Sequence, residues 1–402
     1  GGIEHRIDQT LAGDIAFLFP GQGAQHLNMG REAALYFDEL RQALEGADRV
    51  LEGTAPQALS RYILPASTFD EGEEALQTKA LTDTRIAQPA IGALSLGYLR
   101  LAERLGFKAA AAAGHSYGEY TALLAAGVLG EADFLKLSAA RGEAMARAAS
   151  SGTPGGMAAV QGERGQITAL IAGFAGVIVA NHNTPGQSVI SGPRAALEAA
   201  LVKLADAGLK ATVLPVSGAF HTALVAPAKA ALSAAIAATP FHPARFAVYS
   251  NSSAAPYPAE PAAMQQQLDA HLLSSVEFVA EIEALHGAGC RVFLELGPKG
   301  ICTNMARQIL AGKPAVAVSL DGQGGGLRGL LAGLAELFVA GAAWRPSALF
   351  ARRDLPLLDV AQVLERGRPL LLAKHLWMVS GGCARPINDP VLRTGLQPAL
   401  TA

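Results

Sequence analysis

The chain has 402 residues, of which 50% are hydrophobic and 16% charged, enough apolar sequence for one large domain with a smaller satellite. With 32 Lys and Arg against 34 Asp and Glu, and no basic run, nothing indicates a nucleic-acid or anionic-membrane partner. The three cysteines lack metal-ligand spacing and no apolar stretch is long enough to span a bilayer, which predicts a reduced, cytoplasmic protein.

The first part of the chain alternates short apolar runs with helical patterns. Residues 1–13 are polar, lack the apolar core of a signal peptide and predict a linker. The elements that follow are a strand at 14–19 that ends in a Pro-Gly-Gln-Gly turn, a helix at 86–105, a strand at 109–113, and helices at 117–126 and 131–149. This order predicts a parallel sheet with helices on both faces.

A turn-rich break at residues 150–156 precedes a second pattern. It reads as a strand at 157–160, a helix at 163–173, strands at 177–181 and 188–191, a helix at 193–207 and a strand at 211–216. The order βαββαβ is ferredoxin-like. It predicts a small α+β domain, residues 152–216, inserted into a large α/β domain of residues 14–151 and 217–320.

Strand patterns return at 248–251 and 291–297, after which the composition changes. The glycine-rich stretch 322–326 has no lysine after it, so a flexible joint explains it better than a phosphate loop. A helix is expected at 327–341, followed by extended sequence. Residues 321–402 therefore predict a linker that lies along the main body.

Ser116 lies between two glycines in Gly114-His115-Ser116-Tyr117-Gly118, between an apolar strand and a helix. Such a turn is typical of a nucleophile elbow, which exposes a serine hydroxyl at a helix N-terminus. The alternative is an ordinary strand-to-helix turn with a capping serine.

A serine nucleophile needs a base and an oxyanion hole. His221 follows a strand and a glycine turn, which predicts a place beside a strand end, although a loop histidine without a role remains the alternative. The backbone N–H groups of Tyr117 and Gln22 are candidates for the oxyanion hole. Arg141, flanked by small residues, suits a carboxylate ligand, with a surface salt bridge as the alternative.

Six motifs occur in the order of one known family: FPGQGAQ at 19–25, GHSYGE at 114–119, AARGEAM at 139–145, NHNTPGQSVISG at 181–192, GAFH at 218–221 and LELGP at 294–298. On these, the chain resembles malonyl-CoA:acyl carrier protein transacylases and the acyltransferase domains of type I polyketide synthases, from about residue 14 to 320. The finer resemblance is to iterative enediyne-type or polyunsaturated fatty acid synthases. The resemblance implies an α/β-hydrolase-like large domain, with residues 321–402 as the linker after the acyltransferase.

The resemblance also implies roles for single residues. The residues concerned are Ser116 as nucleophile, His221 as base, Gln22 and Tyr117 in the oxyanion hole, Arg141 on the malonyl carboxylate, and Asn181 near the acyl pocket, unless it only caps a turn. The family carries Phe at the position of Phe220 in malonyl-selective domains, although this ring can equally be a core residue. His271 stands where many relatives have Gln, which leaves its contribution to substrate binding or to the catalytic histidine open.

The function implied is transfer of a malonyl unit from malonyl-CoA to the phosphopantetheine thiol of an acyl carrier protein, without a cofactor or metal of its own. Neighbouring polyketide synthase domains are the expected partners in cis, in antibiotic biosynthesis of the enediyne kind. A serine thioesterase or lipase-like hydrolase is the alternative enzyme, and an inactive scaffold domain the alternative without chemistry. Against the hydrolase stand Arg141 and the lack of an HGGG-type loop.

Overall fold

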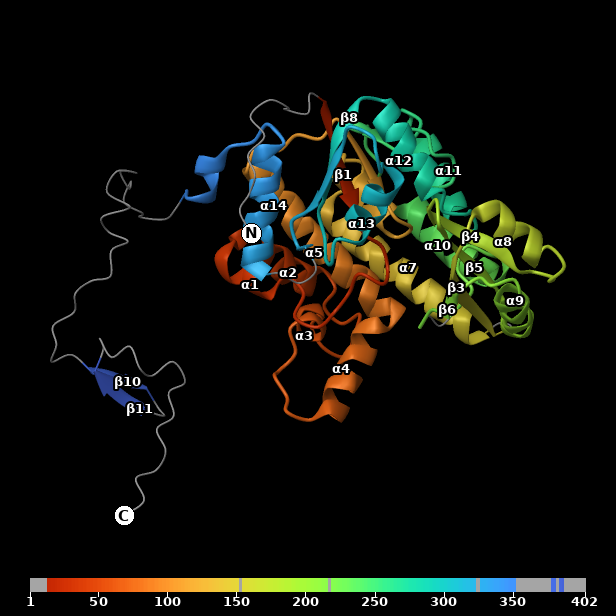
Figure 1. Ribbon diagram of the computed structural model, residues 1–402, viewed down its shortest axis with the longest axis horizontal. Helices are drawn as coiled ribbons and strands as arrows, with labels where there is room; N and C mark the ends of the chain where they lie inside the picture. Colours follow the sequence, from red (N-terminus) through yellow and green to blue (C-terminus); the bar gives the residue numbers. More distant parts are fainter. Residues whose placement is uncertain are drawn as a thin grey trace, which may run out of the picture. The chain divides into compact units, whose positions relative to one another are not determined.

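The apolar run at the start of the chain forms strand β1 (Asp14–Phe19), the middle strand of a parallel sheet in the order β7-β2-β1-β8-β9 (Figure 1). The other strands are β2 (Ala111–Gly114), β7 (Ala247–Val248), β8 (Cys290–Glu295) and β9 (Val316–Ser319). Side chains alternate along β1, so Phe17 and Phe19 join one hydrophobic cluster and Ala16 and Leu18 another. Both faces of the sheet are buried, which explains the unbroken apolar sequence.

The computed structural model describes residues 13–151, 154–215, 218–322, 326–351, 377–380 and 383–386. The predicted linker 1–13 lies outside these residues apart from Gly13, and residues 152 and 217, where the predicted small domain begins and the large domain resumes, also lie outside them. The chain divides into two units, residues 1–349 and 350–402. In the second unit, β10 (Trp377–Ser380) and β11 (Cys383–Pro386) form an antiparallel pair.

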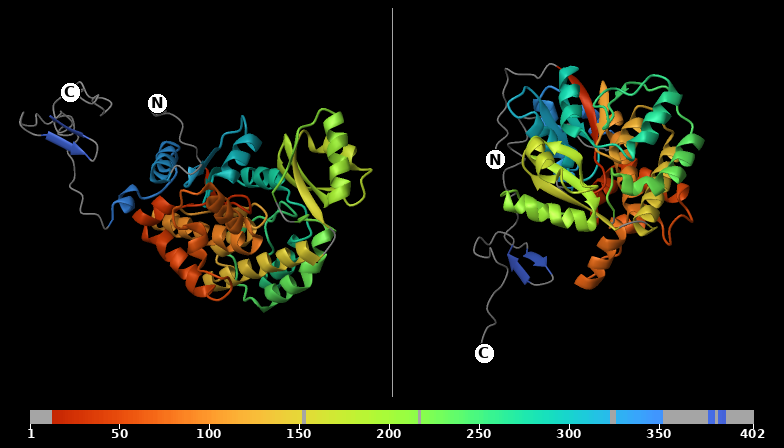
Figure 2. Two further views of the ribbon diagram at one scale, coloured as in Figure 1. Left: turned by 90° about the horizontal axis from the view of Figure 1, so that it is seen from below. Right: turned by 90° about the vertical axis from the view of Figure 1, so that its right-hand side faces the viewer.

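Helices cover both faces of the central sheet, as predicted (Figures 1 and 2). Helices with residues in the cluster of Phe17 and Phe19 are α1 (Arg31–Tyr36), α2 (Asp38–Val50), α3 (Leu59–Ile63), α4 (Glu71–Thr82), α5 (Thr84–Arg104), α6 (Gly118–Ala125), α7 (Glu131–Ser151), α10 (Ala226–Ala238), α11 (Pro261–His271) and α14 (Gly326–Val339). On the face of Ala16 and Leu18 lie α12 (Phe278–Gly287) and α13 (Ile301–Ile309).

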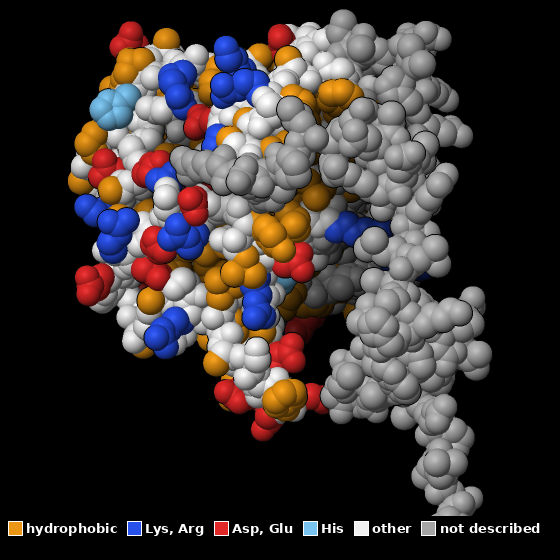
Figure 3. Space-filling view, turned by 90° about the vertical axis from the view of Figure 1, so that its left-hand side faces the viewer, with side chains coloured by type: hydrophobic (Ala, Val, Ile, Leu, Met, Phe, Trp, Pro, Cys, Tyr) orange, Lys and Arg blue, Asp and Glu red, His pale blue; other side chains and the backbone are white. Residues whose placement is uncertain are grey.

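Helix α4 (Glu71–Thr82) projects from this body at the bottom of Figure 1. Asp70 caps its N-terminus, where the side chain accepts hydrogen bonds from the backbone N–H groups of Gly72 and Glu73. Acidic side chains gather over this projection in Figure 3, whereas basic and acidic side chains are interspersed on the rest of the coloured surface. Leu81 is the one residue of α4 that is buried in the described structure, so this helix contributes little to the hydrophobic core.

The inserted block forms a four-stranded antiparallel sheet in the order β4-β5-β3-β6. Its elements are β3 (Gly155–Gln161), α8 (Arg164–Ile171), β4 (Ile178–Thr184), β5 (Gln187–Pro193), α9 (Arg194–Asp206) and β6 (Ala211–Val213). Helices α8 and α9 pack on one face through a separate hydrophobic cluster (Figure 2). The βαββαβ prediction is confirmed; the observed strands begin and end within a few residues of the predicted ones.

Strand β4 of the small sheet is hydrogen-bonded to the segment before α12. The backbone N–H of His182 donates to the carbonyl of Val276, and the N–H of Val276 donates to the carbonyl of Ala180, both at 2.8 Å. Arg164 and Glu277 form an ion pair at 2.5 Å beside this contact. The small sheet is thus attached close to the carboxyl end of the central sheet.

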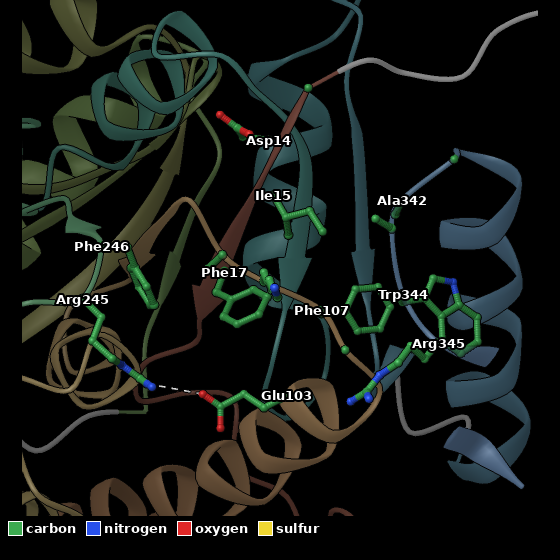
Figure 4. Close-up of a pocket in the computed structure, with 16 residues that line it drawn as sticks. Asp14, Ile15, Phe17, Glu103, Phe107, Arg245, Phe246, Ala342, Trp344 and Arg345 are labelled. Atoms are coloured by element: carbon green, nitrogen blue, oxygen red, sulfur yellow. Dashed lines mark hydrogen bonds and ion pairs between the residues drawn. The ribbon is translucent and has the colours of Figure 1, made fainter. Parts of the chain in front are cut away.

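The segment after α14 packs at the other, amino-terminal end of the central sheet. The Trp344 ring stacks on Phe107 with centroids 5.6 Å apart, and the N–H of Arg345 donates to the carbonyl of Leu105 at 2.7 Å. A groove of about 1300 Å³ lies between this segment and the start of β1 (Figure 4). It contains none of the candidate site residues, which lie where the strands end.

Candidate active site

The turn that carries Ser116 is held tightly against the first strand. Strand β2 ends at Gly114 and α6 begins at Gly118, and the N–H of His115 donates to the carbonyl of Phe19 at 2.9 Å. A Cβ at Gly118 would overlap the Phe19 carbonyl oxygen, and one at Gly114 would overlap the backbone of Gly118. The two glycines therefore allow the strand and helix to meet at the sharp turn that the sequence predicted.

Ser116 and His221 lie together. The Oγ of Ser116 is 2.9 Å from the Nε2 of His221, and the Nδ1 of His221 is 2.8 Å from the carbonyl oxygen of Ser274. A carbonyl can only accept, so we assign the ring proton to Nδ1. This tautomer leaves Nε2 free to take the proton of the serine hydroxyl.

The environment of His221 keeps its ring neutral. Burial, and next the positive charge of Arg141, lower the pKa of the His221 imidazole to about 3. Ser116 and His221 also both have left-handed backbone conformations, with φ at +52° and +59°. Residues other than glycine adopt this conformation at a cost, so the surrounding contacts must hold it.

The turn after β1 passes directly beside the nucleophile elbow. An added Cβ at Gly21 would overlap the carbonyl oxygen of His115 and lie 3.4 Å from the backbone nitrogen of Tyr117. Within the part of the chain that is described, the backbone N–H groups of Gln22 and Tyr117 make no hydrogen bond. Two free backbone donors beside the nucleophile elbow are what an oxyanion hole requires.

The side chain of Gln22 is fixed from helix α5. Its Nε2 donates to Thr84 Oγ1 at 3.1 Å, and its Oε1 accepts from Gln88 Nε2 at 3.3 Å. Thr84 and Gln88 were not identified from the sequence. A glutamine within an apolar helical stretch was the available signal, and the structure shows that Gln88 is fully buried, which is unusual for this residue type. These contacts hold the turn that carries the Gln22 N–H.

Arg141, on α7, is buried to 1% exposure and has no carboxylate partner among the described residues. Its Nε and Nη2 make no hydrogen bond there, and its guanidinium carbon lies 5.9 Å and 5.4 Å from the ring centroids of Tyr117 and Tyr120. Burial lowers the pKa of Arg141 from its ordinary value. A buried guanidinium with free donors has the geometry to bind a planar anion such as a carboxylate.

The Tyr117 side chain lies beneath this site. Its ring is fully buried, stacks on Tyr120 at 6.0 Å and donates its hydroxyl proton to Ser138 Oγ at 2.7 Å. Gly92 of α5 makes room for it, because a Cβ there would overlap the hydroxyl oxygen. The ring thus forms the floor under Arg141.

Phe220 and Asn181 approach from two further elements. Phe220, next to His221, is buried at the edge of the main hydrophobic cluster. Asn181 lies within β4 rather than after it, is buried, and has an Oδ1 without a hydrogen bond among the described residues. The neighbouring Asn183 accepts a hydrogen bond from the ring of His115 at 2.8 Å, which ties the small sheet to the elbow.

His271 lies behind the catalytic histidine. Its ring is fully buried at the end of α11, 5.7 Å from the His221 ring centre, and its Nε2 is 3.6 Å from Glu119 Oε2. Burial holds the pKa of His271 well below its ordinary value and raises that of the Glu119 carboxyl to about 7. The orienting acceptor for His221 is instead the Ser274 carbonyl, which no side-chain pattern could have revealed.

No group of three or more His, Cys, Asp or Glu side chains is placed to hold a metal ion in the residues that the structure describes. The same residues include no helix with the length and apolarity of a membrane span.

The profile of the family described as "Acyl transferase domain" matches residues 16–343. The chain is 32% identical over 315 residues to a polyunsaturated fatty acid synthase polypeptide of Thraustochytrium sp., covering 76% of this chain but only 11% of that protein. It is 34% identical over 311 residues to malonyl CoA-acyl carrier protein transacylase of Bacillus subtilis, covering 76% of this chain and 93% of that one.

The fold matches a solved structure as well. The acyltransferase domain from the second module of the salinomycin polyketide synthase aligns with a TM-score of 0.74 and 30% identity, over 86% of this chain and 79% of that domain. Three observations point to the same family. They are the parallel α/β sheet with its ferredoxin-like insert, the serine–histidine pair at the strand ends, and the match over residues 16–343. The chain therefore belongs to the acyl transferase domain family and is an acyltransferase.

Proposed function

We propose that this chain transfers a malonyl unit from malonyl-CoA to the phosphopantetheine thiol of an acyl carrier protein through an acyl-Ser116 intermediate. The observation that supports malonyl as the substrate is Arg141, a buried cation with unpaired hydrogen-bond donors that could bind the malonyl carboxylate. Its positive charge also lowers the pKa of His221, which places it near the proposed base. The transacylase relative that the chain covers almost fully is named for the same donor and acceptor.

In the first half-reaction, Ser116 Oγ attacks the thioester carbonyl while its proton moves to His221 Nε2. The N–H groups of Gln22 and Tyr117 hold the oxyanion of the tetrahedral intermediate. The C–S bond then breaks, and the proton passes from His221 to the departing thiolate of coenzyme A. The product is malonyl-Ser116, with its carboxylate paired to Arg141.

The second half-reaction runs the same steps with a different thiol. His221 takes the proton of the phosphopantetheine thiol as its sulfur attacks the serine ester. The C–O bond to Ser116 breaks and the serine oxygen regains a proton from His221. The malonyl thioester of the carrier protein leaves, and the kinetics are ping-pong.

The acyl group is selected at both ends. Arg141 favours a carboxylate over the methyl of acetyl, and the Phe220 ring crowds the α-carbon against methylmalonyl, by an amount worth about 10–200-fold. We assign Asn181 to the proposed substrate pocket, and His271, which is fully buried behind His221, to the support of that ring. The reaction as written uses only protein groups and needs no cofactor.

We place this activity in a multidomain synthase of the cytoplasm, where the chain supplies extender units for iterative polyketide synthesis beside other domains. The similarity to a polyunsaturated fatty acid synthase, of whose matched polypeptide the chain spans about a tenth, supports this setting. The antibiotic and enediyne assignment belongs to the same proposal.

The test is intact-protein mass spectrometry after brief incubation with malonyl-CoA, methylmalonyl-CoA or acetyl-CoA. Wild-type protein should gain a malonyl adduct of about 86 Da, by the mass of the acyl group that replaces a hydrogen, and Ser116→Ala should gain none. Addition of a phosphopantetheinylated carrier protein should discharge the adduct.

Two other outcomes would reject the proposal. Release of free coenzyme A without an adduct or carrier acylation would identify a hydrolase. Neither adduct nor released coenzyme A would identify a domain that has kept the fold without the chemistry.

A further inference from the structure

Asn251 follows the short edge strand β7, which runs parallel to β2. The pairing of the two strands continues past β7, because the N–H of Tyr249 donates to the carbonyl of Ala112 at 2.8 Å. In a regular parallel ladder, residue 251 would next donate its backbone N–H to Gly114 and accept from the N–H of Ser116. Gly114 and Ser116 are the last strand residue and the nucleophile.

The side-chain amide of Asn251 makes these two bonds in place of its backbone. Its Nδ2 donates to the Gly114 carbonyl at 2.5 Å, and its Oδ1 accepts from the Ser116 N–H at 2.6 Å. The backbone N–H of Asn251 turns away and donates to Glu119 Oε2 at 2.7 Å, while its carbonyl accepts from the N–H of Glu277 at 2.8 Å. One side chain thus extends the sheet around the elbow.

The chemistry of the partners allows only one orientation of this amide. A backbone N–H must face Oδ1, and a carbonyl must face Nδ2. The second Nδ2 proton is donated to Glu281 Oε2 at 3.0 Å. Asn251 is fully buried, so no water competes for these contacts. Neither an apolar side chain nor a carboxylate could satisfy all three.

The bond to Ser116 acts where the backbone is under strain. Ser116 has φ at +52°, a conformation that persists only where the surroundings fix it. We infer that Asn251 is a positioning residue, whose amide holds Ser116 in this conformation so that Oγ faces His221 and the next N–H faces the oxyanion. The inference rests on the proposed function only in taking Ser116 as the nucleophile.

The experiment measures the reactivity of Ser116 with a fluorophosphonate probe, which needs no acyl donor. In this labelling, Ser116 Oγ bonds to phosphorus, fluoride leaves and His221 takes the proton. In Asn251→Ala the maximal labelling rate should fall by roughly 10²-fold, since misplacement of a reacting group by about 1 Å has that effect. The probe concentration for half-maximal rate should stay within about threefold, because the probe's binding surface is unchanged.

Asn251→Asp provides a variant of the same shape. A protonated Asp still has one donor for Gly114 and one acceptor for Ser116, whereas its ionised form has no donor. Glu119 on α6, Glu281 on α12, His271 on α11 and Tyr257 surround the site, and burial among the two carboxyls favours the protonated form. Its labelling rate should therefore fall between about pH 6 and 9 relative to that of wild type.

Ser253→Ala, an exposed change in the same turn, is the matched control and should label at the wild-type rate. The inference is overturned if folded Asn251→Ala labels within threefold of wild type, or if only the half-maximal concentration changes. If both Asn251 variants fail to fold, amide hydrogen exchange in wild type decides: Ser116 should be protected, and rapid exchange of its N–H would reject the bond. Failure of malonyl transfer alone would reject the proposed function and leave the labelling result standing.

Discussion

Arg141 is a buried positive charge. Its side chain is nearly inaccessible to solvent and forms no ion pair with a carboxylate among the described residues. Arg141→Ala removes the partner of a substrate carboxylate, and an unpaired buried charge costs on the order of 3–5 kcal/mol. Malonyl transfer should therefore fall by roughly 10²–10⁴-fold, while acetyl transfer changes little. Steady-state rates with the two donors check this, and an unchanged malonyl-to-acetyl ratio would contradict the role of Arg141.

The second prediction at this scale concerns pH. With a pKa of about 3, below the ordinary value, His221 is neutral and able to act as a base at every pH above that range. The rate at which the fluorophosphonate probe phosphonylates Ser116 should therefore be independent of pH from about pH 5 to 8.

Arg141→Ala is the internal comparison. It removes a positive charge that lowers the pKa of His221, so any acid limb should move to higher pH in this variant. An inflection near pH 6.5 in wild type would mean that the imidazole is solvated, contrary to its burial.

The residues that the sequence identified are those whose chemistry shows in a local pattern. Ser116 sits in an elbow motif, and Arg141 lies among small residues. Ser274 and Asn251 could not be found in this way, since one acts through its backbone carbonyl and the other acts on a turn 135 positions earlier in the chain. Such contacts depend on which strands become neighbours, and no short stretch of sequence records that.

Among the structural elements, the joint between β1, β2 and α6 is the most crowded. In Gly118→Ala the new Cβ would overlap the Phe19 carbonyl oxygen and lie 3.1 Å from that of Pro20, both of them backbone atoms that cannot turn aside. The free energy of unfolding should fall by about 1–3 kcal/mol, as for other overpacked sites. Urea denaturation measures this, and Ser116 labelling should slow as well.

Gly46→Ala in α2 is the matched control, because an added Cβ there meets nothing within 4 Å. A helical glycine replaced by alanine in open space should raise the free energy of unfolding by about 0.5–1 kcal/mol. Equal effects of the two substitutions would show that close packing at Gly118 is not what matters.

The sequence predicted secondary structure best where a single hydrophobic periodicity, of a helix or of a strand, is clear. The strands at 14–19 and 188–191 and the helix at 131–149 appear within a few residues of their expected ends. Strand β9 and helix α12 were not predicted, because β9 is a short apolar run without alternation and the charged Glu281 interrupts the buried face of α12. Their burial in the core decides their structure, and burial is a property of the whole fold.

In the first unit, the proposed active site and the segment after α14 lie at opposite ends of the central sheet. Trp344 stacks on Phe107 at the amino-terminal end, beside the groove drawn in Figure 4, whereas Ser116 lies at the carboxyl end. Trp344→Ala should lower the free energy of unfolding by about 1–3 kcal/mol through lost burial and stacking. Labelling of Ser116 at 25 °C should stay at the wild-type rate.

Trp344→Phe, which retains a stacking ring, should recover most of the lost stability. A slowed Ser116 in folded Trp344→Ala would show that the segment after α14 acts on the active site across the sheet. That result would contradict the separation of the two ends.

The unpaired guanidinium of Arg141 has a consequence for the life of the protein outside catalysis. Under the proposed function, a bound malonyl group pairs with this buried charge and adds to the free energy that opposes unfolding. The vacant enzyme is thus the most fragile species of the cycle. Under the proposed function, a shortage of the acyl donor would therefore make these molecules easier to unfold and to degrade.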